Sequence, residues 1–210
     1  MVVGGRFPQP HPLMSNSIQR HPLGLTWVET SGMRRAAHAL RADGRVWLID
    51  PFEDDIALSA ATELGSPAAV IQLIDRHNRD CGAIAQRLEV PLLRVPDAVN
   101  DSPFTVLPVI SRPWWRENAL WWESERALVI AEAVGTAPAF SLGRQVGLHP
   151  LLRLRVPKGA LTAYSPERLF VGHGAALESG AAAAIADALD RAVSDIPQLV
   201  LKLPSLARGT

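Results

Sequence analysis

The chain has 210 residues, of which 48% are hydrophobic, enough to build one sizeable core. Its 21 basic residues balance its 21 acidic residues, so no overall field favours nucleic acid or an anionic membrane as a partner. The single cysteine, Cys81, excludes an internal disulfide and a zinc cluster built from cysteines. The N-terminus lacks the apolar core of a signal peptide, and no run is long enough to span a bilayer. We therefore expect a cytoplasmic protein without nucleic-acid or membrane partners.

The first residues differ in composition from the rest of the chain. Residues 1–22 are rich in proline and small polar types without an apolar period, which predicts a loosely ordered N-terminal arm. We expect residues 23–210 to form a single domain. Its first elements are predicted as strands at 25–29, 37–40 and 46–50. The third strand ends in Asp50, and Pro51 then breaks the pairing.

Helices and strands alternate in the next part of the chain. Asp54 or Asp55 can cap a helix that Gly65 and Pro67 end. Its apolar face is predicted to hold Ile56, Leu58, Ala61 and Leu64. A strand, a helix and a second strand are then predicted at 70–74, 82–88 and 91–95. This β-α-β-α-β order favours helices packed on a sheet.

The second half is predicted to be richer in strands. Three prolines between residues 96 and 116 predict an extended segment or loop. The elements that follow are a hairpin of strands 119–123 and 127–131, a strand at 168–172, a helix capped by Ser179 that runs to about Val193, and a short apolar stretch between Pro197 and Pro204. Two strand groups, each followed by helices, predict an α/β protein with two sheets packed face to face and helices outside.

Polar residues gather where two of these strands end. Residues 75–82 carry acids, a histidine and arginines, and His173 lies between two glycines after the strand 168–172. Loops at strand ends are positioned by a rigid sheet and can carry reactive side chains. A Gly-x-Ser-x-Gly elbow, a phosphate loop and a dinucleotide fingerprint are missing from the sequence. Cys81 is a poor candidate nucleophile, because nearby acids raise the pKa of a thiol.

In this order, these features resemble the metallo-β-lactamase fold superfamily over residues 25–193. The resemblance implies a four-layer αββα sandwich whose active-site loops follow the strands. The family motif His-x-His-x-Asp-His then aligns with Asp75, His77, Arg79 and Asp80, so that only its second histidine is retained. Glu132 aligns with a metal-bridging aspartate and His173 with the final histidine. One further histidine is missing, because none occurs between His77 and His149.

The resemblance places a former active-site cleft at Asp50, Asp75, His77, Arg79, Asp80, Glu132 and His173. It predicts that Asp50, His77, Glu132 and His173 converge at one edge of the two sheets. Arg79 opposes a metal there, because within about 5 Å it would repel a dication by roughly 6 kcal/mol at an effective dielectric near 20. We therefore expect no metal cofactor and a pairing of Arg79 with a carboxylate of Asp75, Asp80 or Glu132. In that case His77 and His173 are structural residues.

Two functions remain open from the sequence. The favoured one is a degenerate, non-catalytic site that binds a small molecule or a protein partner through the former cleft. The alternative is a hydrolase with a single zinc, manganese or magnesium ion and an activated water. Its candidate ligands are Asp75, His77, Asp80, Glu132 and His173, with Glu132 also available to orient the water.

Four of the six tryptophans lie close together, at Trp114, Trp115, Trp121 and Trp122. Adjacent strand positions point to opposite faces of a sheet, so each pair must divide between two faces. These rings are expected either to fill both sides of a covered sheet or to line a ligand pocket or a subunit contact.

Overall fold

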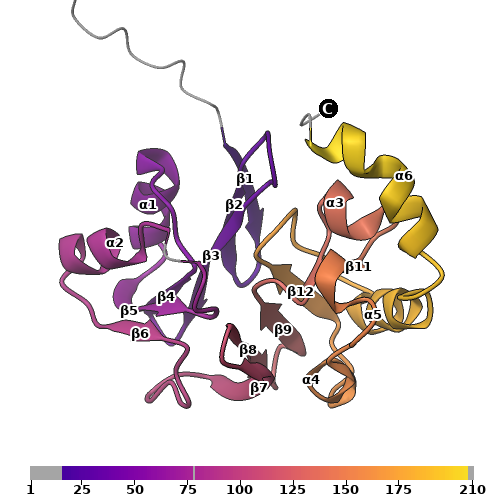
Figure 1. The fold of residues 1–210 in the computed structure, drawn as a ribbon. Coiled ribbons are helices and arrows are strands. Elements are labelled where there is room, and N and C mark those ends of the chain that lie inside the picture. The colour runs from indigo at the N-terminus through magenta and orange to yellow at the C-terminus, as the bar shows by residue number, and fades with distance from the viewer. Residues whose placement is uncertain (1–15, 78, 208–210) are drawn as a thin grey trace, which may run out of the picture.

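The computed structural model describes residues 16–77 and 79–207. Two β-sheets lie in its centre, with helices on both outer sides (Figure 1). The first sheet contains β1 (Ser17–His21), β2 (Gly24–Val28), β3 (Ala36–Ala42), β4 (Arg45–Ile49), β5 (Ser66–Gln72) and β6 (Leu92–Arg94), in that order. Adjacent strands of this sheet are antiparallel from β1 to β4 and parallel from β4 to β6.

The second sheet has the strand order β12-β9-β8-β7. Its strands are β7 (Phe104–Arg112), β8 (Trp115–Trp122), β9 (Ala127–Ile130) and β12 (Arg168–Val171). The pair β9 and β12 is parallel, whereas β8 is antiparallel to both of its neighbours. A small separate ladder joins β10 (Val134–Gly135) to β11 (Gly147–Leu148).

Helices cover the outer faces of both sheets. The first sheet carries α1 (Asp55–Thr62) and α2 (Cys81–Arg87), and the second is flanked by α3 (Pro138–Ser141), η1 (Pro150–Leu152), α4 (Lys158–Thr162), α5 (Ala181–Asp190) and α6 (Ile196–Ala207). One buried cluster joins Leu48 and Val70 to Leu58 and Ile84 beneath α1 and α2. A larger cluster fills the space between the sheets and extends to α5. The predicted four-layer α/β sandwich is thus confirmed.

The chain between residues 96 and 116, predicted as an extended segment or loop, is extended over Phe104–Arg112 and forms the nine-residue strand β7 there. Pro108 lies within it, next to a shift of register before Ile110. β7 is an edge strand of its sheet. Proline is tolerated there because an edge strand needs no donor on its outer side.

Several helix ends also differ from the predictions. Asp54 caps α1 as predicted, with its carboxylate accepting from the backbone N–H of Ala57 at 2.8 Å, but Ile56 on the predicted apolar face is 76% exposed. Gly180, with φ 71°, takes the N-cap of α5 in place of Ser179. The apolar stretch between the last two prolines belongs to α6, whose second residue is Pro197, a position where no helical N–H is lost.

The predicted N-terminal arm falls largely on residues outside the described part of the chain. Within the described part, Ser17–His21 instead forms β1 and pairs with β2. The Asn16 side chain donates to the Asp54 carboxylate at 2.7 Å. Among the described residues, no helix combines the length and apolar character needed to cross a membrane.

Candidate functional site

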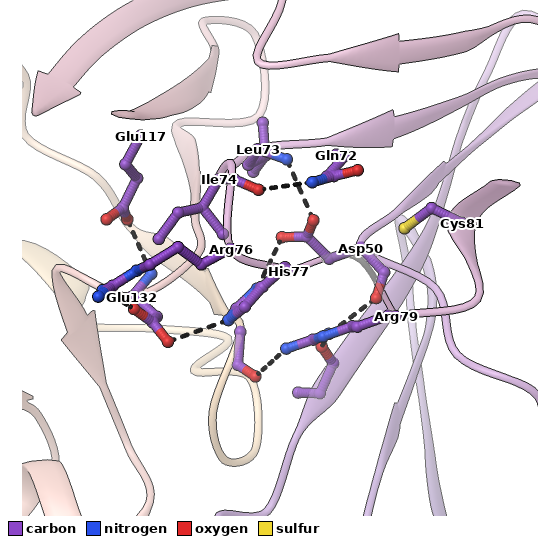
Figure 2. A network of polar contacts seen from close by, with 12 residues as sticks. Asp50, Gln72, Leu73, Ile74, Arg76, His77, Arg79, Cys81, Glu117 and Glu132 are labelled. Carbon is purple, nitrogen blue, oxygen red and sulfur yellow. Dashed lines mark hydrogen bonds and ion pairs between the residues drawn. The ribbon is translucent and has the colours of Figure 1, made fainter. Parts of the chain in front are cut away.

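The candidate site forms where strands of both sheets end (Figure 2). Asp50 directly follows β4, and His77 lies in the loop after β5, which is parallel to β4. Glu132 and His173 follow β9 and β12, which are also parallel to each other. Parallel strands present their carboxyl ends at the same edge, so each sheet contributes two loops to one place. The backbone N–H of Ala36 donates to the carbonyl of Gly172 at 2.8 Å and connects the two sheets there.

Three candidate ligand atoms meet at the centre of the site. Nε2 of His77 lies 3.1 Å from Oε1 of Glu132, and Nε2 of His173 lies 3.7 Å from the same oxygen. The ligand atoms of all three residues are within 4.8 Å of one another. The convergence of Asp50, His77, Glu132 and His173 predicted from the sequence is therefore observed in the fold.

Backbone and carboxylate acceptors orient the two imidazole rings. Nδ1 of His173 lies 3.0 Å from the carbonyl of Met33 and must donate to it, because a carbonyl only accepts. Nδ1 of His77 faces a carboxylate oxygen of Asp50 at 3.5 Å, longer than an ordinary hydrogen bond. Both Nε2 atoms consequently point toward Glu132. Nε2 of His173 is buried and has no hydrogen-bond partner among the described residues.

Protonation of His77 makes this arrangement favourable. Burial and the positive charge of Arg79 lower the pKa of His77, but the carboxylates of Asp50 and Glu132 outweigh them and raise it. For Glu132, burial raises the pKa, while the facing imidazoles of His173 and His77 bring it far below its usual range. An imidazolium of His77 between two carboxylates is the state that these shifts favour.

Arg79 does not make the predicted carboxylate pair. Its guanidinium donates instead to the backbone carbonyls of Ala36, Asp50 and Gly172, at 2.6, 2.7 and 3.0 Å (Figure 2). The prediction failed because backbone carbonyl oxygens of three separate segments lie close together at the strand ends, and a planar guanidinium can reach several of them at once. Burial lowers the pKa of Arg79, and the nearby charge of Asp50 raises it. Arg79 therefore supports backbone rather than pairing with a side chain.

The two other predicted acids point elsewhere. The Asp75 carboxylate accepts from the backbone N–H of Arg116 at 3.0 Å, and the Asp80 carboxylate accepts from that of Glu53 at 2.9 Å. Both carboxylates thus accept from backbone N–H groups and do not join the histidine cluster. Cys81 is buried, and burial raises the pKa of its thiol to about 12, which removes it as a nucleophile.

Three residues without a predicted role support Glu132. Arg76 donates to the second carboxylate oxygen of Glu132 at 2.7 Å, and its guanidinium lies 3.9 Å from the ring centroid of Trp115. Glu117 is fully buried and accepts from the backbone N–H groups of Glu132 and Ala133, at 2.7 and 2.9 Å. Its other oxygen accepts from the Trp115 indole at 3.0 Å. The sequence carries no distinct signal for Glu117, because this residue lies between the polar residues Arg116 and Asn118.

The tryptophan cluster divides into core and surface. Trp115, Trp121 and Trp122 are at most 5% exposed. These three rings therefore fill the core, which agrees with the expectation that the tryptophans pack against a covered sheet. Trp114 is 57% exposed in the turn between β7 and β8. Its ring lies edge-on to Trp115 with 6.0 Å between centroids.

Comparison with known proteins finds similarity at the level of structure. No protein-family model matches the sequence, and no curated protein matches it. The crystal structure of the metallo-β-lactamase DIM-1 superposes with a TM-score of 0.58 at 11% sequence identity and covers 85% of this chain and 97% of its own. The crystal structure of VMB-1 superposes with a TM-score of 0.59 at 9% identity and covers 87% of this chain and 99% of its own. A fragment from Nostoc sp. PCC 7120 described as diflavin flavoprotein A 5 superposes with a TM-score of 0.60 at 14% sequence identity. The match covers 89% of this chain and 99% of the fragment. The chain therefore has the metallo-β-lactamase fold.

The donor set can be tested against the metal that the fold implies. His77, Glu132 and His173 supply two imidazole nitrogens and one carboxylate oxygen, a donor set found in mononuclear zinc sites. Asp50 and the Met33 carbonyl face the Nδ1 atoms of the two histidines, and acceptors in this position orient metal-binding imidazoles. By donor type and spacing, these residues fit one cation. They offer no second set of ligands within the described part of the chain.

Proposed function

We propose that this protein of metallo-β-lactamase fold has a degenerate metal site and acts by binding a small molecule through the former cleft, without zinc-dependent hydrolysis. The observation that carries the proposal is the position of Arg79. Its guanidinium lies against the backbone carbonyls around the site, and its positive charge lowers the pKa of His77. A permanent cation built into the fold supplies charge that these sites otherwise obtain from metal.

The charge balance supports this proposal. The carboxylates of Asp50 and Glu132 carry two negative charges, and the guanidiniums of Arg76 and Arg79 already carry two positive charges. A dication would add a net charge of about two in a buried place, where uncompensated charge is costly. A single proton on His77 adds only one charge and lies between Asp50 and Glu132. The proton is therefore the better match to this cluster.

Metal content and hydrolysis test the proposal together. The protein is purified without chelator and analysed for zinc, manganese, magnesium and iron, then assayed on a lactam, a thioester and a phosphodiester. We expect well under one metal per chain and no hydrolysis beyond that of His77→Ala. His149→Ala is a matched control, because His149 is a half-buried histidine outside the three-residue cluster. One stoichiometric metal, with hydrolysis abolished by chelator and by His77→Ala only, would contradict the proposal.

One observation favours the second candidate function, a hydrolase with a single divalent metal. Nε2 of His173 is buried, points at Glu132 and lacks a partner among the described residues. A cation held by His77, Glu132 and His173 would give that nitrogen a role. When bound, such a metal supplies a water whose pKa lies near neutrality. Asp75 and Asp80, which the sequence suggested as further ligands, are absent from this set.

A cytoplasmic location remains a prediction, based on the single, buried Cys81. The balanced charge likewise predicts no nucleic-acid partner. Fractionation of the native host and a nucleic-acid binding assay at low salt would test these two predictions.

A further inference from the structure

We infer that the ligand of this site is a small molecule that joins an anionic group to a flat apolar group, held by Arg76 and Trp114. The inference rests on the proposed ligand-binding function and adds to it the chemical class of the ligand. It follows from the contacts on the β8 side of Glu132, which differ in character from the buried cluster around His77.

Arg76 offers unused hydrogen-bond donors at the edge of the site. Its side chain is 38% exposed, and one terminal nitrogen binds Glu132 at 2.7 Å. Among the described residues, it makes no other hydrogen bond, so the remaining N–H groups of its fork are open. A guanidinium with this geometry suits the two oxygens of a carboxylate or phosphate.

Trp115 holds the Arg76 guanidinium in place before any ligand binds. The guanidinium carbon lies 3.9 Å from the ring centroid, within the range of a strong cation–π contact. Trp115 is itself fully buried, and Glu117 fixes its indole nitrogen. An arginine that is already ordered loses little conformational entropy when it binds, which favours affinity.

Trp114 provides an exposed apolar surface in contact with Trp115, the ring on which Arg76 stacks. It is the one member of the tryptophan cluster with an exposed ring. The guanidinium of Arg112 lies 5.6 Å from its centroid and adds a second positive charge at the same turn. Single exposed apolar residues are common, but tryptophan and arginine are the residue types enriched among those that dominate binding energy.

The charges on this side select the sign of the ligand. Arg76 and Arg112 are both cationic, and the carboxylate paired with Arg76 is that of Glu132. Glu132 is shared with two histidines, which leaves excess positive charge at the rim. A cationic ligand would be repelled there, and a neutral one would leave the open donors of Arg76 unpaired.

Binding of defined probes to the full chain tests this class of ligand. Phenylacetate and phenyl phosphate carry both groups, whereas acetate lacks the ring, benzyl alcohol lacks the charge and benzylamine reverses it. Calorimetry with chelator present should show one or both phenyl anions binding at least tenfold more tightly than the three incomplete probes. Comparison of the two phenyl anions distinguishes a carboxylate ligand from a phosphate ligand.

Variants assign the binding to the two residues. Arg76→Gln should weaken the preferred phenyl anion about tenfold or more, the loss expected for a charged hydrogen bond. Trp114→Ala should weaken it about threefold to tenfold, the range of an aromatic contact. Arg20→Gln and Leu154→Ala, which change exposed residues elsewhere, should leave binding unchanged. Because Trp114 is exposed, its replacement tests the site even where Arg76→Gln perturbs folding.

The outcomes separate the ligand class from the proposed function. Equal binding of benzyl alcohol, or full binding by both Arg76→Gln and Trp114→Ala, overturns the ligand class. Failure of a metal-free protein to bind either phenyl anion also overturns it, while the proposal of a degenerate metal site stands. Binding that requires added zinc and disappears with chelator overturns both.

Discussion

The guanidinium of Arg79 binds the backbone of Asp50 and leaves the carboxylate of that residue free for other partners. Arg79 donates to the Asp50 carbonyl at 2.7 Å, while the Asp50 carboxylate accepts from the backbone N–H of Leu73 at 3.1 Å and faces His77. The same guanidinium also binds the carbonyls of Ala36 and Gly172. It therefore joins the start of β3 to the ends of β4 and β12, which belong to different sheets.

Replacement of Arg79 should destabilise the fold through these carbonyls. Arg79→Ala removes this donor from all three carbonyl oxygens, although the Gly172 carbonyl keeps the backbone N–H of Ala36. Each buried acceptor left unsatisfied costs about 1–3 kcal/mol, so we expect the free energy of unfolding to fall by about 2 kcal/mol or more in urea denaturation. The stability of Arg79→Lys should lie between those of the unaltered protein and Arg79→Ala, because an ammonium cannot bind all three oxygens in one plane. Arg20→Ala, an exposed control, should change stability by less than about 0.5 kcal/mol, and an equally small change for Arg79→Ala would refute the cross-link.

The same position should control metal affinity. Arg79→Gln removes the buried positive charge but keeps a side chain that can donate to one or two of the carbonyls. Because repulsion of a dication would be reduced, zinc titration should show affinity at least tenfold higher than in the unaltered protein. Adding Glu132→Gln to this variant should abolish the gain. Unchanged zinc affinity in Arg79→Gln would show that Arg79 does not set the charge of this site.

Glu117 should act as the acceptor that fixes the Glu132 loop. Its carboxylate accepts three N–H groups, and burial raises its pKa to about 7 although those hydrogen bonds lower it. Glu117→Gln places an amide N–H against another donor, so stability should fall by about 1–3 kcal/mol. Trp115→Phe removes the indole donor, and in a double-mutant cycle it should restore part of that loss. Strict additivity of the two changes would argue against the contact.

The sequence predicted which distant residues lie close together, but not which hydrogen bonds their side chains make. Asp50, His77, Glu132 and His173 each follow a predicted strand, and the shared edge of parallel strands brings such positions together. The order of strands and helices, together with the resemblance to the metallo-β-lactamase fold superfamily, was therefore sufficient to predict where the candidate site lies.

The partners of the charged side chains could not be predicted in this way. Arg79 has three acids within reach in the sequence, but its acceptors are backbone carbonyls contributed by three separate segments. Only the tertiary structure brings those carbonyls together around one guanidinium. The pairing of the segment 104–112 as strand β7 was not predicted, because a proline within a strand is compatible only with an edge position. Local sequence does not show which strand lies at the edge of a sheet.

A buried histidine away from the site should make the stability of the protein depend on pH. Nε2 of His38 donates to the carbonyl of Val171 at 3.0 Å, so Nδ1 accepts from the hydroxyl of Thr26 at 2.9 Å. This chain joins β2 and β3 to β12 and requires a neutral ring. Burial, followed by the nearby His21, lowers the pKa of His38 from 6.5 to about 3.

The sign of the effect follows from the direction of this shift. Below pH 6.5 the unfolded chain binds a proton at His38 that the folded protein excludes, so stability falls as the pH decreases from 6.5 toward 3. The slope reaches about 1.4 kcal/mol per pH unit for one such group. His38→Gln should be less stable at pH 7.5, since it disturbs the contacts to Thr26 and Val171, but its stability should fall less steeply toward pH 4.5. Urea denaturation of both proteins across this range measures the difference, in which carboxylates common to both cancel. Parallel curves would show that His38 is protonated equally in the folded and unfolded states.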